Sequence, residues 1–146
     1  MYVERTLDLA TAVDIVDNAI FLAVEQNLDP ICAVVLDAGG VPLTMKSQDG
    51  CGIMRYEIAF GKAYGALGMG TSGRDLQERL RDRPNFGSAL SSLSKGRFVP
   101  NPGGVLILNE KSRAVGALGI SGDTSERDDR CAIAAIAASG HATCPS

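Results

Sequence analysis

The chain has 146 residues, the length of one ordinary domain, and its hydrophobic content of 45% is enough for a packed core. Its 14 basic and 17 acidic residues are mixed along the chain and give a net charge of −3, which argues against nucleic acids and anionic membranes as partners. No apolar run reaches the ~18–20 residues of a membrane span, and the N-terminus lacks a signal-peptide pattern, so we expect a cytoplasmic protein.

The first predicted element is a helix over residues 7–28. Apolar side chains recur there at three- and four-residue steps, the period of one buried helix face. Thr6 precedes the helix as its expected N-cap, and Pro30 forbids its continuation. The expected buried stripe consists of Leu9, Val13, Val16, Ile20 and Val24.

A β-hairpin and a second helix follow. The apolar runs 31–36 and 41–47 flank Gly39-Gly40, whose glycines suit the positive φ of a tight hairpin turn. A helix is predicted from about residue 53 to residue 67, where a group of glycines ends it.

The next part of the chain predicts two short helices and a second hairpin. Ser72 is the expected N-cap of a polar helix that reaches about Arg81, and residues 86–93 predict another short helix. The apolar runs 103–108 and 114–120 predict two strands joined by a polar turn.

The last predicted helix runs from about residue 124 to Ser139, and Gly140 ends it. Its segment 131–139 is apolar nearly all round, so it must be buried on most sides. We expect this helix to form a subunit interface of a homo-oligomer. The alternative is a central core helix within one chain.

The order of the elements indicates the fold class. Sequential strands joined by tight turns imply an antiparallel sheet, so we predict an α+β fold with helices flanking the sheet. No linker or repeat divides the chain, which is predicted to be a single domain over residues 1–146.

The cysteines show no metal-binding or disulfide motif. The four cysteines form no Cys-x-x-Cys pair, and the only histidine, His141, cannot complete a zinc set of common spacing. We therefore expect reduced thiols and no metal. Cys51, between two glycines ahead of a predicted helix, is the best candidate nucleophile, with a small loop residue as the alternative.

Charged candidates gather after the second predicted strand. Arg55 and Lys62 are seven residues apart and share one side of a helix. Two cations aimed into one cleft could clamp a carboxylate, the arginine as a bidentate fork and the lysine as a point charge. The alternative is that both are surface residues paired with Asp49 or Glu57.

Glycine-rich strand ends offer bare backbone near the last helix. The amides of Gly103-Gly104 and Ser121-Gly122 could bind an anion in a nest, with ordinary turn chemistry as the alternative. Asp128 lies in the first turn of the helix, as a general base or as a residue that stabilises the helix dipole. We expect the ammonium of Lys62 in a pocket bordered by Gly103-Gly104, close to a subunit boundary.

A set of short motifs occurs in order between about residues 9 and 138. It comprises Val34-Val35-Leu36-Asp37-Ala38-Gly39-Gly40, Asp49-Gly50, Lys62-Ala63, Leu76, Pro102-Gly103-Gly104, Val115-Gly116-Ala117-Leu118-Gly119-Ile120-Ser121-Gly122, and Glu126-Arg127-Asp128 followed by Cys131-Ala132. This ordered set resembles the GlcG/haem-binding-protein family, which includes HbpS-like proteins, DUF336 proteins and the C-terminal domain of PduO proteins.

The resemblance implies a profilin-like fold that assembles as dimers or larger rings. It also implies a link to haem binding, corrinoid metabolism or accessory roles in catabolic operons. The residues themselves predict no cofactor, and haem or a corrinoid enters by the resemblance alone. Because His141 is the only histidine and lies near the C-terminus, we expect any histidine-ligated haem to bind weakly or not at all.

Together these features predict a small-molecule-binding accessory protein of a catabolic or cofactor pathway. Its ligand would be anionic, either carboxylated or tetrapyrrole-like. The alternative is a small cofactor-free isomerase or lyase acting on a carboxylated metabolite, in which Arg55 or Lys62 binds the carboxylate. In that case the proton would be moved by Asp49, Glu57 or Asp128.

Overall fold

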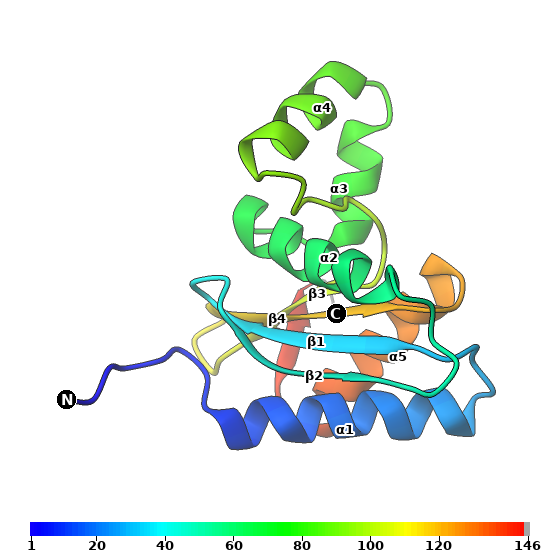
Figure 1. Cartoon of the computed structure of the whole chain (residues 1–146). Coiled ribbons are helices and arrows are strands. Elements are labelled where there is room, and N and C mark those ends of the chain that lie inside the picture. The colour runs from blue at the N-terminus through cyan, green and yellow to red at the C-terminus, as the bar shows by residue number, and fades with distance from the viewer. Residues whose placement is uncertain (145–146) are drawn as a thin grey trace.

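The computed structural model describes residues 1–144, which form one five-stranded sheet with helices on both of its faces (Figure 1). Neighbouring strands are antiparallel, in the order β2-β1-β4-β3-β5. The strands are β1 (Cys32–Asp37), β2 (Pro42–Ser47), β3 (Gly104–Leu108), β4 (Ala114–Ser121) and β5 (Ala142–Cys144). The predicted α+β class with an antiparallel sheet is confirmed.

The helices form two layers and a projecting lobe. One face of the sheet is covered by α1 (Leu9–Glu25) and α5 (Ser125–Ala138), and the other by α2 (Arg55–Met69). Beyond α2, the helices α3 (Gly73–Leu80) and α4 (Pro84–Leu93) form a lobe that rises away from the sheet (Figure 1). Among residues 1–144, no helix combines the length and the apolar character that a membrane span requires.

The first helix differs from its prediction in cap and face. The amide of Thr11 donates to Oδ1 of Asp8 at 2.7 Å, which makes Asp8 the N-cap, whereas the Thr6 hydroxyl donates to a β4 carbonyl. Leu9 and Val24 are 58% and 63% exposed, so the predicted stripe was wrong at both ends. Smaller side chains bring α1 close to its neighbours, and its buried face consists of Ala12, Ile15, Val16, Ala19 and Ala23.

The two faces of the sheet have different cores. On the α1 and α5 side, branched residues such as Ile15 and Leu118 belong to one apolar cluster. On the α2 side, the fully buried apolar residues of the helix are alanines, including Ala59 and Ala63. The backbones approach so closely there that a Cβ at Gly119 would collide with the Ala59 carbonyl oxygen.

One side of the apolar helix α5 packs against α1 and the sheet of the same chain. The amide of Asn18 in α1 donates to the Ala135 carbonyl at 3.2 Å, which ties the two helices together. One side of α5 is therefore a core face, as in the alternative considered from the sequence, whereas Ala137 and Ala138 are exposed and the subunit interface stays a prediction. Its buried apolar residues are Cys131, Ala132, Ala135 and Ile136.

Two turns and the C-terminal segment also differ from their predictions. In the first hairpin only Gly40 has a positive φ, at 80°. The helix expected over residues 86–93 begins earlier, at Pro84, since a first-turn residue needs no amide donor. After Gly140, the short strand β5 pairs with β3, so His141 lies between a helix and a strand and is not a frayed terminal residue.

Candidate functional site

Lys62 lies on the sheet-facing side of α2 and is only 3% exposed. Its ammonium donates to the carbonyl oxygen of Ile120 at 2.9 Å and lies 3.4 Å from Oδ2 of Asp128. Gly103 leaves the space that the ammonium occupies, because a Cβ there would stand 2.9 Å from Nζ. The structure thus places Lys62 beside the Gly103 backbone, with Asp128 as its partner.

Asp128 comes to this pair from the first turn of α5 and is itself 1% exposed. Its Oδ1 accepts a hydrogen bond from the Asp123 amide at 3.1 Å. Burial raises the pKa of Asp128, and the charge of Lys62 opposes that change. Burial likewise lowers the pKa of Lys62, against the attraction of Asp128. The charge of each group thus opposes the effect of burial on the pKa of the other.

Arg55 reaches the same end of β4 from the first turn of α2. Its Nη1 donates to the hydroxyl of the buried Ser121 at 3.2 Å, next to the carbonyl that binds Lys62. Within residues 1–144, the half-buried Arg55 has no carboxylate within 4.0 Å. The cluster of Arg55, Lys62, Ser121 and Asp128, hereafter the strand-end cluster, thus holds two cations and one carboxylate.

A second aspartate fixes the elements around this cluster. Oδ1 of Asp129, which is 2% exposed, accepts from the Gly103 amide at 2.8 Å. Its Oδ2 accepts from Nε and Nη2 of Arg74 at 3.1 and 2.8 Å. These bonds connect α5, the start of β3 and α3. Neither Arg74 nor Asp129 was predicted as a site residue, although two adjacent aspartates at the start of an apolar helix were a usable signal.

The glycines serve close packing more than they expose amides. The Gly103 amide is already bonded to Asp129, so it is not available for the predicted anion nest. A Cβ at Gly104 would collide with the Lys62 carbonyl, and one at Gly122 would collide with the Pro30 carbonyl. A larger residue at position 104 or 122 would therefore disrupt the packing of the backbone.

The two other acidic candidates lie outside the strand-end cluster. Asp49 is exposed and borders a hollow that Ile20 and Lys46 also line. Glu57 is exposed on the outer side of α2, in a cavity with Arg97. The sequence placed four charged candidates in one short segment, but it did not show which of them lie on the same side of the helix. In the structure only Arg55 and Lys62 come together.

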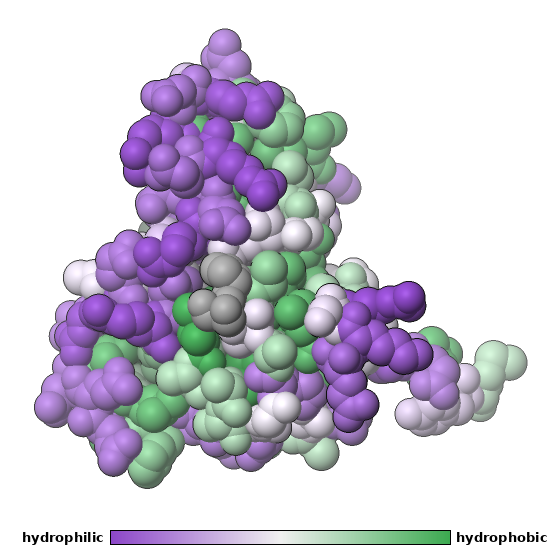
Figure 2. Space-filling view, turned by 180° about the vertical axis from the view of Figure 1, so that it is seen from behind, coloured by the Kyte–Doolittle hydropathy of each residue, from purple (hydrophilic) through white to green (hydrophobic). Residues whose placement is uncertain are grey.

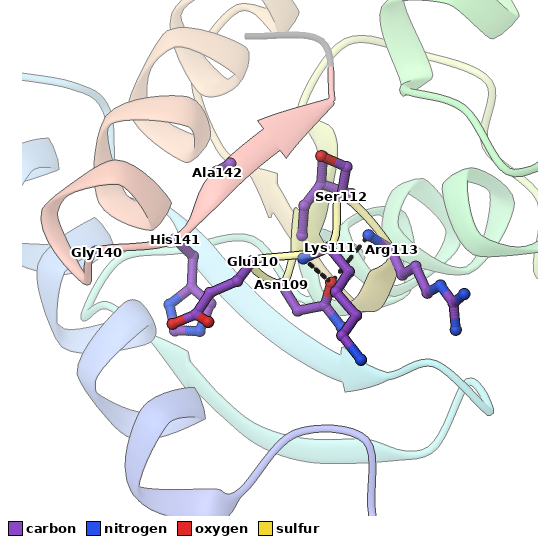
Figure 3. A pocket seen from close by; sticks show the side chains of 9 residues that line it. Asn109, Glu110, Lys111, Ser112, Arg113, Gly140, His141 and Ala142 are labelled. Carbon is purple, nitrogen blue, oxygen red and sulfur yellow. Dashed lines mark hydrogen bonds between the residues drawn. The ribbon is translucent and has the colours of Figure 1, made fainter.

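The single histidine lies in a different hollow, between the β3–β4 turn and the C-terminal segment (Figure 3). This hollow has a volume of about 740 Å³. Oδ1 of Asn109 accepts from the amides of Lys111 and Arg113, and these bonds shape the turn. In the view of Figure 3, His141 and Glu110 extend to one side of the hollow and the two cations to the other. Among residues 1–144, no group of three or more potential ligand side chains is arranged to hold a metal.

The fold and the strand-end cluster define a small α+β protein whose charged residues meet where α2 and α5 approach the end of β4. Residues 7–137 match the family described as haem degrading protein HbpS-like, and the chain belongs to this family. A relative from Citrobacter freundii, an uncharacterized 15.0 kDa protein encoded in the dhaT-dhaS intergenic region, is 32% identical over 135 residues, which cover 90% of each chain.

Solved structures agree with this assignment. A PduOC–haem complex is 26% identical, with a TM-score of 0.83 over 94% of this chain and 98% of that chain. The Klebsiella pneumoniae protein ORFY, a DUF336 protein, is 23% identical, with a TM-score of 0.82 over 96% and 94% of the two chains. A double mutant of HbpS from Streptomyces reticuli is 22% identical, with a TM-score of 0.78 over 94% and 90%. The last two show the fold alone.

Proposed function

We propose that this chain is a cytoplasmic accessory protein that binds a small carboxylated ligand at the strand-end cluster. The observation that carries this proposal is the state of Arg55, a half-buried cation bonded to a hydroxyl and to no carboxylate within residues 1–144. A guanidinium offers two parallel donors to a carboxylate, and such charge-assisted bonds are strong. Because Asp128 balances Lys62, the charge of Arg55 remains available for a ligand.

The buried pair has a supporting role in this proposal. Lys62 is sealed between α2 and the end of β4, so it holds the two elements together. Its positive charge lies close enough to Arg55 for the two to repel each other. That repulsion favours a guanidinium that points away from the buried pair, toward an incoming anion.

Haem is the ligand class that the relatives suggest, because a similar crystal structure is a PduOC–haem complex. The propionates of a haem are carboxylates that Arg55 would bind. An iron ligand fits less well, since His141 lies in another hollow, where charged side chains such as Glu110 and Lys111 share the lining, whereas a porphyrin ring needs apolar walls. The described residues therefore fit a carboxylate, and they do not fit a histidine-ligated haem.

A second candidate function is acid–base catalysis on a carboxylated metabolite, as in an isomerase or lyase. The buried Lys62–Asp128 pair favours it, because burial shifts the pKa of Lys62 down and that of Asp128 up. Exchange of α-hydrogens of succinate and citrate in D₂O, followed by NMR, tests it. Exchange that disappears in Asp128→Asn supports catalysis, and a rate equal to the buffer control removes it.

A thermal-shift screen tests the binding proposal. Succinate, citrate and haemin are added to the wild type, to Arg55→Gln and to Arg113→Gln, an exposed arginine of the β3–β4 turn. We expect at least one carboxylate to raise the Tm of the wild type and of Arg113→Gln, and to raise that of Arg55→Gln far less. Equal shifts in all three proteins would contradict a site at Arg55.

We also propose that the chain self-associates. Helix α4 has no buried residue, although it carries Phe86, Leu90 and Leu93. Figure 2 shows hydrophilic side chains on the α3 side of the projecting lobe and hydrophobic ones on the α4 side. Light scattering should give a mass above 15.2 kDa, lowered by Leu93→Glu. A monomer at micromolar concentration would contradict this.

A further inference from the structure

The outer side of α2, opposite the buried Lys62, carries a row of aromatic rings. Tyr56, Phe60 and Tyr64 follow one another at four-residue steps, the spacing that places side chains on one helix face. Their centroids are 6.2 and 5.7 Å apart, and the second pair is stacked with an interplanar angle of 17°. All three residues are half-buried, so the row forms an aromatic wall that solvent reaches.

A cationic loop, residues 94–98, lies against this wall. Lys95 and Gly96 have positive φ values of 57° and 79°, which turn the loop back toward α2. The Val99 amide then donates to the Gly61 carbonyl at 3.1 Å and fixes the end of the loop on the helix. The guanidinium carbon of Arg97 stands 4.4 Å from the ring centroid of Tyr64.

The charges of this region favour an anion. Nε of Arg97 donates to the Ser94 carbonyl at 2.8 Å, and its two terminal nitrogens have no hydrogen-bond partner within residues 1–144. Lys95 is exposed beside it and forms no ion pair in the same part of the chain. Among residues 1–144, Glu57 is the one carboxylate that lines the cavity between the aromatic wall and the loop.

This cavity has the size of a small ligand site. Its volume is about 300 Å³, at the lower end of the range for small-molecule pockets. Tyr56 and Phe60 line it from α2, and Lys95 and Arg97 line it from the loop. The lining residues are Tyr56, Glu57, Phe60, Lys95, Gly96 and Arg97.

We propose that this cavity is a second binding site, for a small planar aromatic anion. A fused ring system lies on the faces of Tyr56 and Phe60, and its carboxylate or phosphate meets Arg97 and Lys95. The site is separate from the strand-end cluster, because Lys62 reaches Ile120 and Asp128 whereas the aromatic row faces the loop of residues 94–98. Binding at this second site can therefore be tested independently of ligand binding at Arg55.

Fluorescence titration of the full chain tests this site with defined probes. FMN and riboflavin share one ring system and differ by a phosphate, and 2-naphthoate carries a carboxylate instead. We expect saturable quenching of FMN and saturable binding of 2-naphthoate, both tighter than the binding of riboflavin. FMN alone would identify phosphate as the preferred group, and 2-naphthoate alone would identify carboxylate.

Matched variants locate the binding. Arg97→Gln should weaken FMN binding about tenfold and leave riboflavin unchanged, the loss expected for one charge-assisted contact. Arg97→Lys should recover part of that loss, and Phe60→Leu should weaken both flavins. Arg113→Gln should leave FMN binding unchanged, and unfolding curves confirm that each variant is folded.

Three results would overturn the proposal. The first is no saturable binding of any probe up to about 1 mM, the weak end of specific affinity. The second is equal affinity of FMN and riboflavin for the wild type together with no effect of Arg97→Gln. The third is a loss in folded Arg113→Gln as large as that in Arg97→Gln, which would indicate nonspecific attraction to surface cations.

Discussion

The two faces of the sheet are built for different purposes. The face under α1 and α5 is an apolar core in which Ile15 and Leu118 are fully buried. On the face under α2, alanines of the helix pack on Val34 and Leu36 of the sheet, and the layer ends in the charged pair of Lys62 and Asp128. A buried ion pair contributes little net stability compared with apolar packing. The α1 face therefore relies on apolar packing, whereas the α2 face adds a buried ion pair, and it is beside this pair that we propose the ligand site.

The largest effect should follow from breaking the buried pair on one side. Lys62→Met leaves Asp128 as an unpaired buried carboxyl, so we expect a loss of about 3–5 kcal/mol in the free energy of unfolding. The double variant Lys62→Met/Asp128→Leu removes both charges and should recover most of that loss. Urea unfolding measures both. A double variant as unstable as the single one would show that the pair is not an isolated unit.

A substitution in the apolar core under α1 tests the same comparison between the two faces of the sheet. Ile15→Ala removes a fully buried side chain, and we expect a loss of about 2–5 kcal/mol from the core. Ligand affinity should stay as in the wild type, because the α1 face holds no ligand in this account. A folded Ile15→Ala protein that has lost carboxylate binding would show that the two faces are coupled.

The pH dependence of the free energy of unfolding should distinguish the loss caused by Lys62→Met from the loss caused by Ile15→Ala. Burial raises the folded-state pKa of Asp128 above its unfolded value, and Lys62→Met removes the charge that opposed this. The folded variant then binds more protons than the unfolded chain, so its stability rises as pH falls through the folded pKa of Asp128. The difference in free energy of unfolding between the wild type and Lys62→Met should therefore become smaller from pH 7.5 to pH 5, by at most about 1.4 kcal/mol per pH unit.

Urea unfolding at the two pH values measures this narrowing. The loss of unfolding free energy in Ile15→Ala should change little over the same pH range, because this substitution involves no titrating group. If the stability that Lys62→Met loses relative to the wild type did not change with pH, the buried carboxylate of Asp128 could not be the source of the instability.

The smallest effect concerns thiol reactivity on both faces. Cys131 and Cys32 are fully buried, and burial raises the pKa of Cys32 and that of Cys131 to about 11. Cys51 and Cys144 are half-buried. At pH 8 iodoacetamide should therefore label Cys51 and Cys144 in the folded protein, and all four thiols after denaturation, as counted by mass spectrometry. Early labelling of Cys131 would show that the α1 face opens readily.

The sequence predicted the order of the elements well because turns leave strong local signals. Ser72 caps α3 as expected, and its hydroxyl accepts from the Asp75 amide. The face of α1 was harder, because alanines such as Ala12 and Ala19 are compatible with a surface as well as with a core. Three-residue β5 was missed, since a strand this short has no readable period.

The candidate site could be predicted only in part. Helical spacing brought Arg55 and Lys62 together, and the family motifs drew attention to Lys62. The bond between Arg74 and Asp129 joins residues 55 positions apart, and no local pattern reports such a contact. The glycine at position 103 was interpreted as an open nest because its amide partner Asp129 is visible only in three dimensions.

The most direct test of the account is an NMR titration of the arginine side chains with the carboxylate that gives the largest thermal shift. We predict that the ¹⁵Nε–¹Hε resonance of Arg55 moves saturably as that carboxylate is added, while that of Arg74, already paired with Asp129, stays in place. Lys62→Met/Asp128→Leu should retain this response, because the buried pair supports Arg55 from behind and does not itself bind the ligand. A saturable shift of Arg113 with an unchanged Arg55 would contradict the claim that the strand-end cluster is the binding site.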